Sequence, residues 1–464
     1  MTTADPVDRA LVGTRARARV PPEAHAELDT TDRPGAVRVL AGQIPTRVPE
    51  LVPIRHERMM TSPFAFFRGS AAVMAHDLAG SPVSGLDVQL CGDAHLDNFG
   101  LFASPERSLL FDINDFDETC PGPWEWDLKR LAASLVVAGR ENDFTDRDNR
   151  DVVVAGVRRY ANAMATFAGM GNLALWYSRI DADEAKELLG ERLDKRGRKR
   201  LDKSLAKARS RNHLRSLDKM TRVVDGERRI VADPPVVVPV ADLAPGLGRD
   251  EIEHTVQAVL ADYASSLEPG LRELVRSYSF VDMARIASGV GSVGTRCWVT
   301  LMRGRDEDDP LFLQVKQAQQ SVLAGPLGRD DTGHQGRRVV TGQRIMQAAG
   351  DAFLGWQRTT GIDGVERDFY VRQLHDWKGS AKVETMDPAM LAMYAELCGW
   401  TLARAHARSG DRIAIAAYLG DDDALPDALA EYAAAYADLN ERDYATFGES
   451  LAAGELDMQP AGSP

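Results

Sequence analysis

Two short acidic segments in the first quarter of the chain limit most strongly what it can fold into. The first is Cys91–Gly100, which reads CGDAHLDNFG, and the second is Phe111–Glu118, which reads FDINDFDE. The pattern predicts a loop followed by a β-hairpin that turns at residues 103–107. Such a loop and hairpin place an Asp, an Asn five positions later and a second Asp cluster close together. Oxygen ligands of this kind suit a divalent cation and a polyphosphate.

The residue types in these segments are those that phosphoryl transfer requires. In this reaction a carboxylate orients or deprotonates the acceptor hydroxyl, and oxygen ligands hold magnesium against the phosphates. Asp93 is the candidate for the first role, and Asn98 offers a neutral oxygen for the second. An Asp from the hairpin, either Asp112 or Asp115, would supply the charged metal ligand. The competing interpretation of any single Asp or Asn here is a residue that caps a tight turn.

These motifs resemble those of the protein-kinase-like superfamily, and within it the aminoglycoside and choline phosphotransferase branch. That branch has a catalytic loop of the form H-G-D-x-H-x-x-N; here Cys91 replaces the leading His and the other fixed positions match. It continues with I-D-F-x-D and then G-D-P-x-W-D-L, to which residues 113–128 are similar. Cys91–Gly100 also resembles the signature of the uncharacterised bacterial domain-of-unknown-function 2252 family, which implies no substrate.

The resemblance to the phosphotransferase branch implies a role for each residue. Asp93 would be catalytic, and Asn98 and Asp115 would bind the metal. Asp127 follows Asp115 by the twelve residues that the branch requires, and would brace the loop as a structural carboxylate. Counting forward from Asn98 points instead to Asp112 as the metal ligand. Hairpins vary easily in length at their turn, so the downstream spacing is the better guide and Asp112 is the alternative.

The position of the first lysine decides the order of the parts. A kinase-like site needs a lysine on a strand beneath a glycine-rich loop. The first lysine of the chain is Lys129, which follows both acidic segments. The nucleotide-binding part must therefore lie downstream of them or be absent.

A strand, glycine loop, strand, turn and strand ending in Lys316 do occur downstream. We predict the strands over residues 280–288, 295–302 and 311–316. The loop between the first two has the pattern G-x-G-x-x-G and consists of Gly289, Val290, Gly291, Ser292, Val293 and Gly294. A dinucleotide-binding loop would be followed by a helix, whereas Cys297–Leu301 is typical of a strand. The pattern thus favours a kinase-type loop over the dinucleotide type, and a glycine-rich hairpin without a ligand is the other interpretation.

The remaining elements extend the resemblance. A helix is expected over residues 337–349 and a strand pair at 353–356 and 369–374. Three residues then fall where the hinge of a kinase contacts adenine through backbone groups, namely Gln373, Leu374 and His375. A long amphipathic helix is expected over residues 388–409 and contains the sequence LARAHA. In the phosphotransferase branch a similar helix comes directly before the catalytic loop, so the order implies a circular permutation.

We therefore predict an α+β, two-lobed protein-kinase-like fold that is circularly permuted, with a β-rich small lobe and a mainly helical large lobe. Residues 1–50 are expected to form an extended N-terminal arm. Residues 51–278 would form the large lobe with the catalytic loop and metal hairpin, 279–380 the small nucleotide-binding lobe, and 381–464 the helices that complete the large lobe. Folds tolerate such reopening because chain termini lie at the surface.

The predicted activity is ATP- and Mg²⁺-dependent transfer of a phosphoryl group to a hydroxyl of an unidentified small-molecule acceptor. One feature departs from the resemblance, because no Glu that could pair with Lys316 occurs between it and Glu366. Two alternatives therefore stay open: a nucleotide-binding pseudokinase or regulatory module, and a nucleotidyl transferase on the same fold. A metal hydrolase would need several further His ligands, and the histidines of this chain are scattered.

Charge and cysteine content limit the partners and the compartment. The net charge of −13 disfavours broad binding to nucleic acid or to anionic membranes. The four cysteines are dispersed and form no C-x-x-C, which is typical of a reducing environment. The N-terminus resembles no signal peptide, and no apolar run is long enough for a membrane span. We expect a cytoplasmic protein that binds a nucleotide and an acceptor; its oligomeric state is not indicated.

Overall fold

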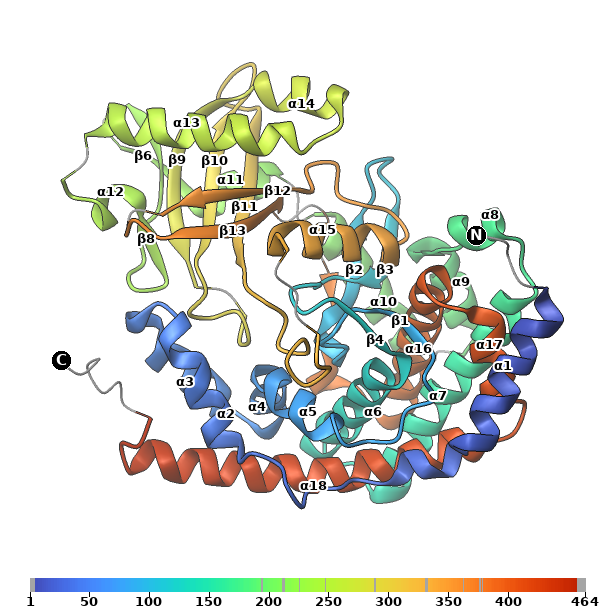
Figure 1. The fold of residues 1–464 in the computed structure, drawn as a ribbon. Helices are drawn as coiled ribbons and strands as arrows, with labels where there is room; N and C mark the ends of the chain where they lie inside the picture. Colours follow the sequence, from blue (N-terminus) through green and yellow to red (C-terminus); the bar gives the residue numbers. More distant parts are fainter. Residues whose placement is uncertain are drawn as a thin grey trace.

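The computed structural model is an α+β protein in which a sheet-bearing part packs against a larger helical part (Figure 1). It describes residues 5–192, 195–210, 213–224, 226–246, 248–287, 289–329, 333–361, 363–374, 377 and 379–456. None of the helices in these ranges is both long enough and apolar enough to cross a bilayer. His375, one of the three residues predicted to contact adenine, lies outside the described residues.

A six-stranded antiparallel sheet has the strand order β12-β13-β11-β10-β9-β8. Its strands are β8 (Val237–Pro239), β9 (Ser279–Ile286), β10 (Cys297–Arg303), β11 (Pro310–Ala318), β12 (Gly355–Thr360) and β13 (Glu366–Gln373). The three strands predicted around the glycine loop are confirmed as β9, β10 and β11. These strands could be predicted because each is a run of β-branched and aliphatic residues bounded by turn residues.

The two faces of the sheet have different neighbours. Helices α13 (Arg249–Ser265) and α14 (Pro269–Arg276) lie across one face, where they pack on Leu313 and Val315. Side chains alternate along a strand. Lys316, the neighbour of Val315 on β11, therefore points to the opposite face, which looks toward the helical part.

The sheet-bearing part begins earlier than the expected boundary at residue 279. Strand β8 pairs with β9, and α11 (His213–Met220) places Leu217 in an apolar cluster with Val299 and Leu301. Two short strands also precede the boundary, β6 (Thr221–Val224) and β7 (Glu227–Ile230). These segments fall within residues 51–278, the region predicted to form the large lobe. The surface that their apolar faces cover is visible only in the folded chain.

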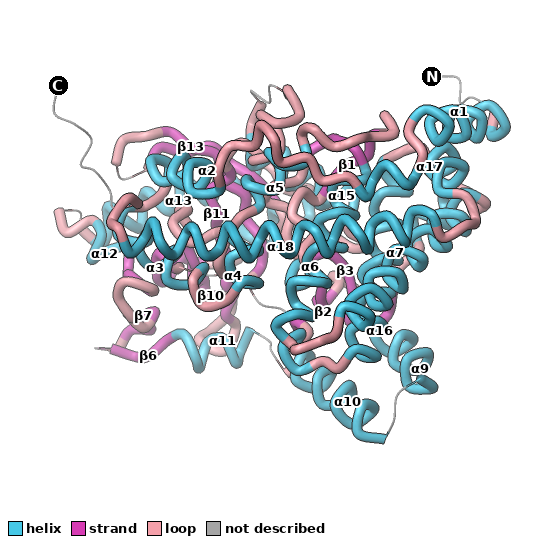
Figure 2. Tube along the Cα trace, turned by 90° about the horizontal axis from the view of Figure 1, so that it is seen from below, coloured by secondary structure: helices cyan, strands magenta, loops and turns pink. Residues whose placement is uncertain are grey.

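The helical part is built around the longest helices of the chain. These are α6 (Trp124–Glu141), α7 (Asp146–Ala168), α16 (Pro388–Ser409) and α18 (Ala424–Ala452). Helix α16 has the bounds that the sequence predicts. Helix α18 runs along the underside of the molecule and contacts α6, α7 and two N-terminal helices, α2 (Ala36–Gln43) and α4 (Pro63–Gly69) (Figure 2). Further helices of the chain, of which α12 and α15 contact the sheet, are α8 (Asn172–Tyr177), α9 (Ala182–Arg192), α10 (Lys195–Arg209), α12 (Val240–Leu243), α15 (Gln335–Met346) and α17 (Arg412–Leu419).

The N-terminal residues are helical rather than an extended arm. They form α1 (Pro6–Arg19) and α2 (Ala36–Gln43), followed by α3 (Val52–Met59), α4 (Pro63–Gly69) and α5 (Ala71–Leu78). Asp5 caps α1 by accepting a hydrogen bond from Val7, and Arg9 forms an ion pair with Asp411 at 2.7 Å. Helix α1 has a weak apolar face and is held by partners about four hundred residues away. Local sequence patterns do not contain that information.

The two acidic segments form the predicted loop and hairpin. Strand β1 (Asp87–Leu90) leads into the loop, and β2 (Phe99–Ala103) pairs with β3 (Leu109–Ile113). Strand β4 (Cys120–Pro123) returns to pair with β1, and the short strands β5 (Ile180–Asp181) and β14 (Gly379–Ser380) extend the hairpin. The end of α16 lies beside β1, since the Gln89 amide donates to Ser409 Oγ at 3.0 Å.

Candidate functional site

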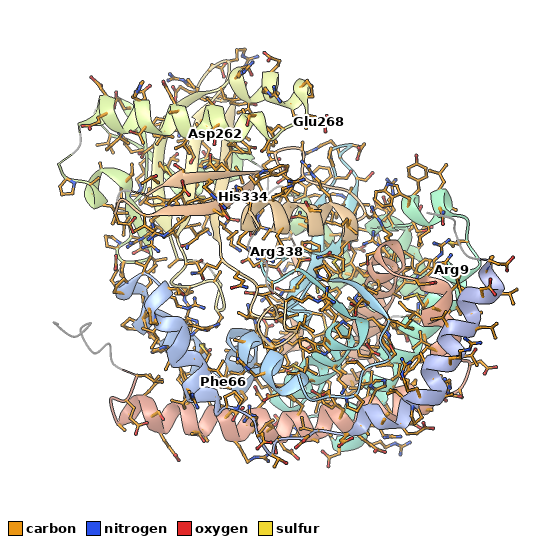
Figure 3. The ribbon with its side chains drawn as sticks, viewed as in Figure 1. Arg9, Phe66, Asp262, Glu268, His334 and Arg338 are labelled. Atoms are coloured by element: carbon orange, nitrogen blue, oxygen red, sulfur yellow. The ribbon has the colours of Figure 1, made fainter. Side chains whose placement is uncertain are left out.

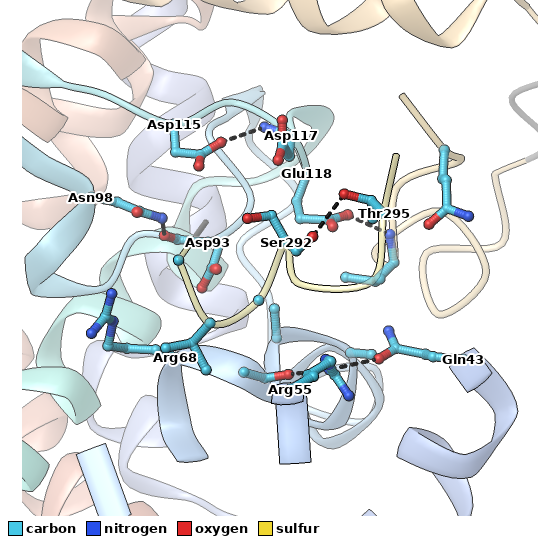
Figure 4. A pocket seen from close by; sticks show the side chains of 18 of the residues that line it. Gln43, Arg55, Arg68, Asp93, Asn98, Asp115, Asp117, Glu118, Ser292 and Thr295 are labelled. Atoms are coloured by element: carbon cyan, nitrogen blue, oxygen red, sulfur yellow. Dashed lines mark hydrogen bonds between the residues drawn. The ribbon is translucent and has the colours of Figure 1, made fainter. Parts of the chain in front are cut away.

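Two cavities meet where the sheet-bearing part joins the helical part. The larger, of about 700 Å³, lies below the sheet and is lined by Lys316, Gln373 and Leu374 among others. The smaller, of about 160 Å³, lies between α3–α5 and the acidic segments, and Asp93 lines only this one. Five residues border both cavities: Arg68, Asn98, Asp115, Gly289 and Ser292. Most of the site residues predicted from the sequence therefore surround one junction (Figure 4).

Asp127 holds the loop that carries Asp93 through hydrogen bonds to its backbone. The Asp127 carboxylate accepts hydrogen bonds from the amides of Cys91 and Gly92, at 2.8 and 3.0 Å. His406 on α16 lies 3.2 Å from the same carboxylate. The predicted bracing role of Asp127 is confirmed. The bracing holds the loop to α6 and α16, two elements of the buried core.

Gly92 is required by the shape of the loop. Its φ angle is 88°, in the left-handed region that glycine adopts at little cost. A Cβ at this position would lie 2.2 Å from the carbonyl oxygen of Glu118. The loop and the end of the second acidic segment thus approach closely through backbone atoms.

Asp93 is held in one orientation by a buried arginine. Arg130 Nε on α6 donates to Asp93 Oδ1 at 2.8 Å, and His95 Nε2 lies 3.6 Å from Asp93 Oδ2. Burial raises the pKa of Asp93 to about 6, and the charge of Arg130 opposes this rise. Burial also lowers the pKa of His95 well below its usual value, so this ring is neutral. The carboxylate is therefore oriented, ionised at neutral pH and within reach of protonation, which suits a group that accepts a proton.

The structure separates the two candidate metal-binding Asp residues. Asp115 lines both cavities, as does Asn98. Asn98 Nδ2 donates to the carbonyl of Asp93 at 2.7 Å, which leaves the Oδ1 oxygen as its atom for a cation. Asp112 lines neither cavity and is 1% exposed, with Arg404 Nη2 2.7 Å from its Oδ1. Its carboxylate is committed to the protein interior, so the site geometry favours Asp115.

Lys316 is brought to the second acidic segment. Its Nζ lies 2.5 Å from Asp117 Oδ2 and 3.7 Å from Asp115 Oδ2. Tyr370 on β13 donates to the other oxygen of Asp117 at 2.6 Å. Burial opposes the charge of Lys316, but the two carboxylates outweigh it and raise the pKa of Lys316 well above its ordinary value. Asp117 is thus a functional candidate that sequence reasoning missed, although it lies within the acidic motif.

Helix α15 has no Glu that could pair with Lys316, and it contributes an arginine to the acidic segment instead. Arg338 donates to the carbonyls of Thr119 and Asp117, at 2.5 and 2.8 Å, and to the carbonyl of Gln319 at 2.8 Å. Figure 3 shows Arg338 on the side of α15 that faces the helical part. The helix therefore holds the backbone of the acidic segment directly, and Lys316 takes its partners from that segment.

The glycine loop lies over the junction of the two cavities. Gly289, Gly291 and Ser292 border the smaller cavity, and Val290 does so as well. Val293 is instead buried against Val48 and Leu51, and Gly294 accepts a hydrogen bond from the Val48 amide at 2.7 Å. Only the first part of the loop can contact a ligand in either cavity. The second part anchors the loop to the N-terminal helices.

The predicted adenine-contacting segment lines the larger cavity, but its amides are occupied. Asp351 accepts a hydrogen bond from the Gln373 amide at 2.6 Å, and the Leu374 amide donates to the carbonyl of Phe312 at 2.9 Å. Neither N–H group is available to a base. Contacts from these two residues would have to use their carbonyl oxygens or side chains.

Three arginines and a glutamate border the smaller cavity without having been predicted as site residues. They are Arg47, Arg55, Arg68 and Glu118. Burial raises the pKa of Glu118 to about 7. Arg68 lies on α4, which begins after its capping residue Ser62. The other two arginines come from a segment whose position beside the glycine loop follows from the tertiary fold alone.

The donor set tests whether the site suits a divalent cation. No group of three or more His, Cys, Asp or Glu side chains forms a complete metal cage in the described part of the chain. Magnesium usually takes one or two protein oxygens and completes its shell with water and phosphate. Asn98 and Asp115 fit a cation that arrives with a nucleotide, and they do not fit a resident structural metal.

One comparison with known proteins gave a match. The family model described as an uncharacterized protein conserved in bacteria, DUF2252, matches residues 47–450. Searches among curated proteins and among solved structures gave none.

Proposed function

The chain belongs to the DUF2252 family of bacterial proteins, and we propose that it is an ATP- and Mg²⁺-dependent phosphotransferase acting on the hydroxyl of a small molecule. The observation that carries the proposal is the meeting of Lys316 with Asp115 and Asp117. These residues come from distant parts of the sequence and border the cavities that Asn98 and the glycine loop also line. A lysine, an acidic metal segment and a glycine loop are the parts that phosphoryl transfer uses.

The order of the elements supports a circularly permuted kinase-like arrangement. The sheet supplies the glycine loop between β9 and β10 and the lysine on β11, with α15 following. The end of α16 lies beside β1, which leads into the Asp93 loop. A chain that ran directly from α16 into β1 would have the element order of an ordinary kinase. On this proposal the larger cavity receives the nucleotide and the smaller one the acceptor.

Each residue of the junction has a role in the proposed reaction. The acceptor hydroxyl oxygen forms a bond to the γ-phosphorus of ATP while the bond from that phosphorus to the β,γ-bridging oxygen breaks. The electron pair of the broken bond leaves with ADP, and Asp93 accepts the hydroxyl proton. Lys316 and the backbone of the first part of the glycine loop would position the phosphates. Asn98 and Asp115 would hold magnesium, which supplies charge neutralisation for the phosphates when bound.

The decisive test is nucleotide binding followed by product analysis. Calorimetry should detect Mg²⁺-dependent binding of a non-hydrolysable ATP analogue by the wild type. Lys316→Met should weaken this binding at least tenfold, while Asp93→Asn should leave it nearly unchanged because Asp93 borders only the smaller cavity. The wild type is then incubated with ATP and a panel of hydroxyl compounds.

Mass spectrometry of the products separates the proposal from its alternatives. A phosphorylated product that Asp93→Asn fails to form supports the phosphotransferase. A product carrying the nucleotide would identify a nucleotidyl transferase, and ATP binding without turnover across the panel would identify a pseudokinase. Failure of the wild type to bind the analogue would overturn the proposal.

A further inference from the structure

We propose that the acceptor carries an anionic group, phosphate or carboxylate, which binds Arg47, Arg55 and Arg68 while its hydroxyl faces Asp93. This inference rests on the proposed function, since it names the acceptor class of the same site. Its basis is the distribution of charge around the smaller cavity.

The three arginines form a basic wall contributed by the N-terminal helices. Arg55 lies on α3 and Arg68 on α4, while Arg47 precedes α3, and all three border the smaller cavity. Arg55 is 1% exposed and Arg47 is 9% exposed. Placing guanidinium groups away from water is costly unless an opposite charge compensates them. These buried guanidinium groups therefore require an anionic partner.

Arg55 has only neutral partners. Its Nη2 donates to the carbonyl of Gly69 at 2.8 Å and to Gln43 Oε1 at 3.1 Å. In the part of the chain that the structure describes, its Nε and Nη1 are buried and have no acceptor. Burial, together with the charge of Arg47, lowers the pKa of Arg55 well below its usual value. The guanidinium is therefore electrostatically uncompensated by protein carboxylates.

The other two arginines add to this positive potential. Arg47 Nη1 donates to the carbonyls of Gly291 and Val293, which carry no net charge. Arg68 forms an ion pair with Asp97 at 2.9 Å. The Nε atoms of both arginines are buried and lack an acceptor among the described residues. Among the described residues Asp97 is the one carboxylate that forms an ion pair with any of these three arginines, and Glu118 acts on Arg47 only through its charge.

The acidic groups lie on the opposite wall. In Figure 4 Asp115, Asp117 and Glu118 lie on one side of Ser292, and Arg55 and Arg68 lie on the other. A molecule in this cavity is therefore oriented by charge, with its anionic end at the arginines. Its hydroxyl can then reach Asp93, whose carboxylate borders the same cavity.

The two cavities offer separate sites for the acceptor and the nucleotide. Arg47 and Arg55 border the smaller cavity and not the larger one, whereas Lys316 borders the larger one and not the smaller. The phosphates of a nucleotide beside Lys316 therefore leave these two arginines to a second anion. A volume of about 160 Å³ admits only a small molecule.

The test is calorimetric titration of the full chain with inorganic phosphate and, separately, with acetate. The protein is first saturated with Mg²⁺ and the non-hydrolysable ATP analogue, and a parallel titration omits the analogue. We expect saturable binding of one anion to the wild type, weakened about tenfold to a hundredfold in Arg55→Gln and in Arg68→Gln. Tighter binding of phosphate indicates a phosphorylated acceptor, and tighter binding of acetate indicates a carboxylic acid.

Arg38→Gln is the matched control. Arg38 is exposed on α2 and borders neither cavity, so this variant removes the same charge without changing the proposed anion site. A cooperative urea-unfolding transition serves as the folding check for each variant, and Arg68→Gln provides the test if Arg55→Gln does not fold.

Absence of saturable binding of either anion, or equal weakening in Arg38→Gln, would overturn the inference while leaving the phosphotransferase proposal intact. Anion binding that Arg55→Gln weakens, in a protein that does not bind the analogue, would support the anion site and overturn the phosphotransferase.

Discussion

The ammonium nitrogen of Lys316 lies 2.5 Å from Asp117 Oδ2 although 199 residues separate the two along the chain. Lys316 is 3% exposed, and Asp115 Oδ2 lies 3.7 Å from the same nitrogen. A charged group buried to this degree depends on its partners. The pair therefore joins the sheet to the acidic segment at the junction of the two cavities.

Removing the lysine should destabilise the fold as well as the site. Lys316→Met removes the ammonium group that lies beside Asp117 and Asp115, at a cost of about 3 kcal/mol in the free energy of unfolding. The double variant Lys316→Met, Asp117→Asn should recover much of this loss because the carboxylate nearest to the missing ammonium group is neutralised. Urea-induced unfolding measures both. A double variant as unstable as the single one would show that the ion pair does not hold the segment.

The two hairpin aspartates should respond differently to substitution. Asp112→Asn breaks a fully buried pair with Arg404 and should cost about 3–5 kcal/mol of stability. Asp115→Asn should change the stability little, since its side chain is 33% exposed, and should weaken Mg²⁺-dependent binding of the ATP analogue at least tenfold. Unfolding curves and calorimetry on both variants test this assignment. Loss of magnesium dependence in a folded Asp112→Asn protein would reverse it.

Asp93 should give activity and stability opposite dependences on pH. With a pKa of about 6 in the folded protein, the carboxylate becomes protonated as the pH falls below 6, and kcat/KM should fall with it. The raised pKa means that the folded state binds the proton more tightly than the unfolded state. The stability contribution of this group is therefore present at low pH and lost as the pH rises through 6.

The neutral variant isolates this effect. The loss of the ion pair with Arg130 lowers the stability of Asp93→Asn at every pH, so the expected signal is the change with pH: between pH 4 and pH 8 the difference in unfolding free energy should shift in favour of the variant by about 1–3 kcal/mol. Unfolding curves at several pH values measure the difference. A difference in unfolding free energy that does not change between pH 4 and pH 8 would contradict the raised pKa of Asp93.

Gly92 should not tolerate a side chain. Gly92→Ala combines a positive φ with a contact between Cβ and the Glu118 carbonyl, so we expect a loss of at least 2 kcal/mol and of nucleotide-dependent activity. Gly80→Ala is the control, because a Cβ there meets no atom within 4 Å. Thermal unfolding of both variants provides the comparison. Equal stability of the two would mean that the loop can relax away from the Glu118 carbonyl.

Local patterns determined much of the fold. The strands that flank the glycine loop, the helix over residues 388–409 and the hairpin after Asn98 were all predicted from residue alternation, helical periodicity and turn residues. The bracing role of Asp127 was implied by the resemblance to the phosphotransferase branch. The absence of lysine before Lys129 also required that any nucleotide-binding strands come later in the chain.

Local sequence patterns did not predict which residues line the smaller cavity. Arg47 lies in the predicted arm and Arg55 at the start of the predicted large lobe, and this region packs beside a loop more than two hundred residues away. Whether an arginine faces solvent or a cavity depends on that distant packing. Periodicity within the segment does not record it.

By itself, the sequence determined the strands around the glycine loop, the hairpin after Asn98 and the helix over residues 388–409, together with the candidate residues of the proposed site. Only the tertiary structure decided that Asp112 pairs with Arg404 in the core while Asp115 faces Lys316. Both aspartates lie on the same short stretch and differ in sequence by three positions. Their roles differ because the contacts that compensate a buried charge come from distant segments of the chain.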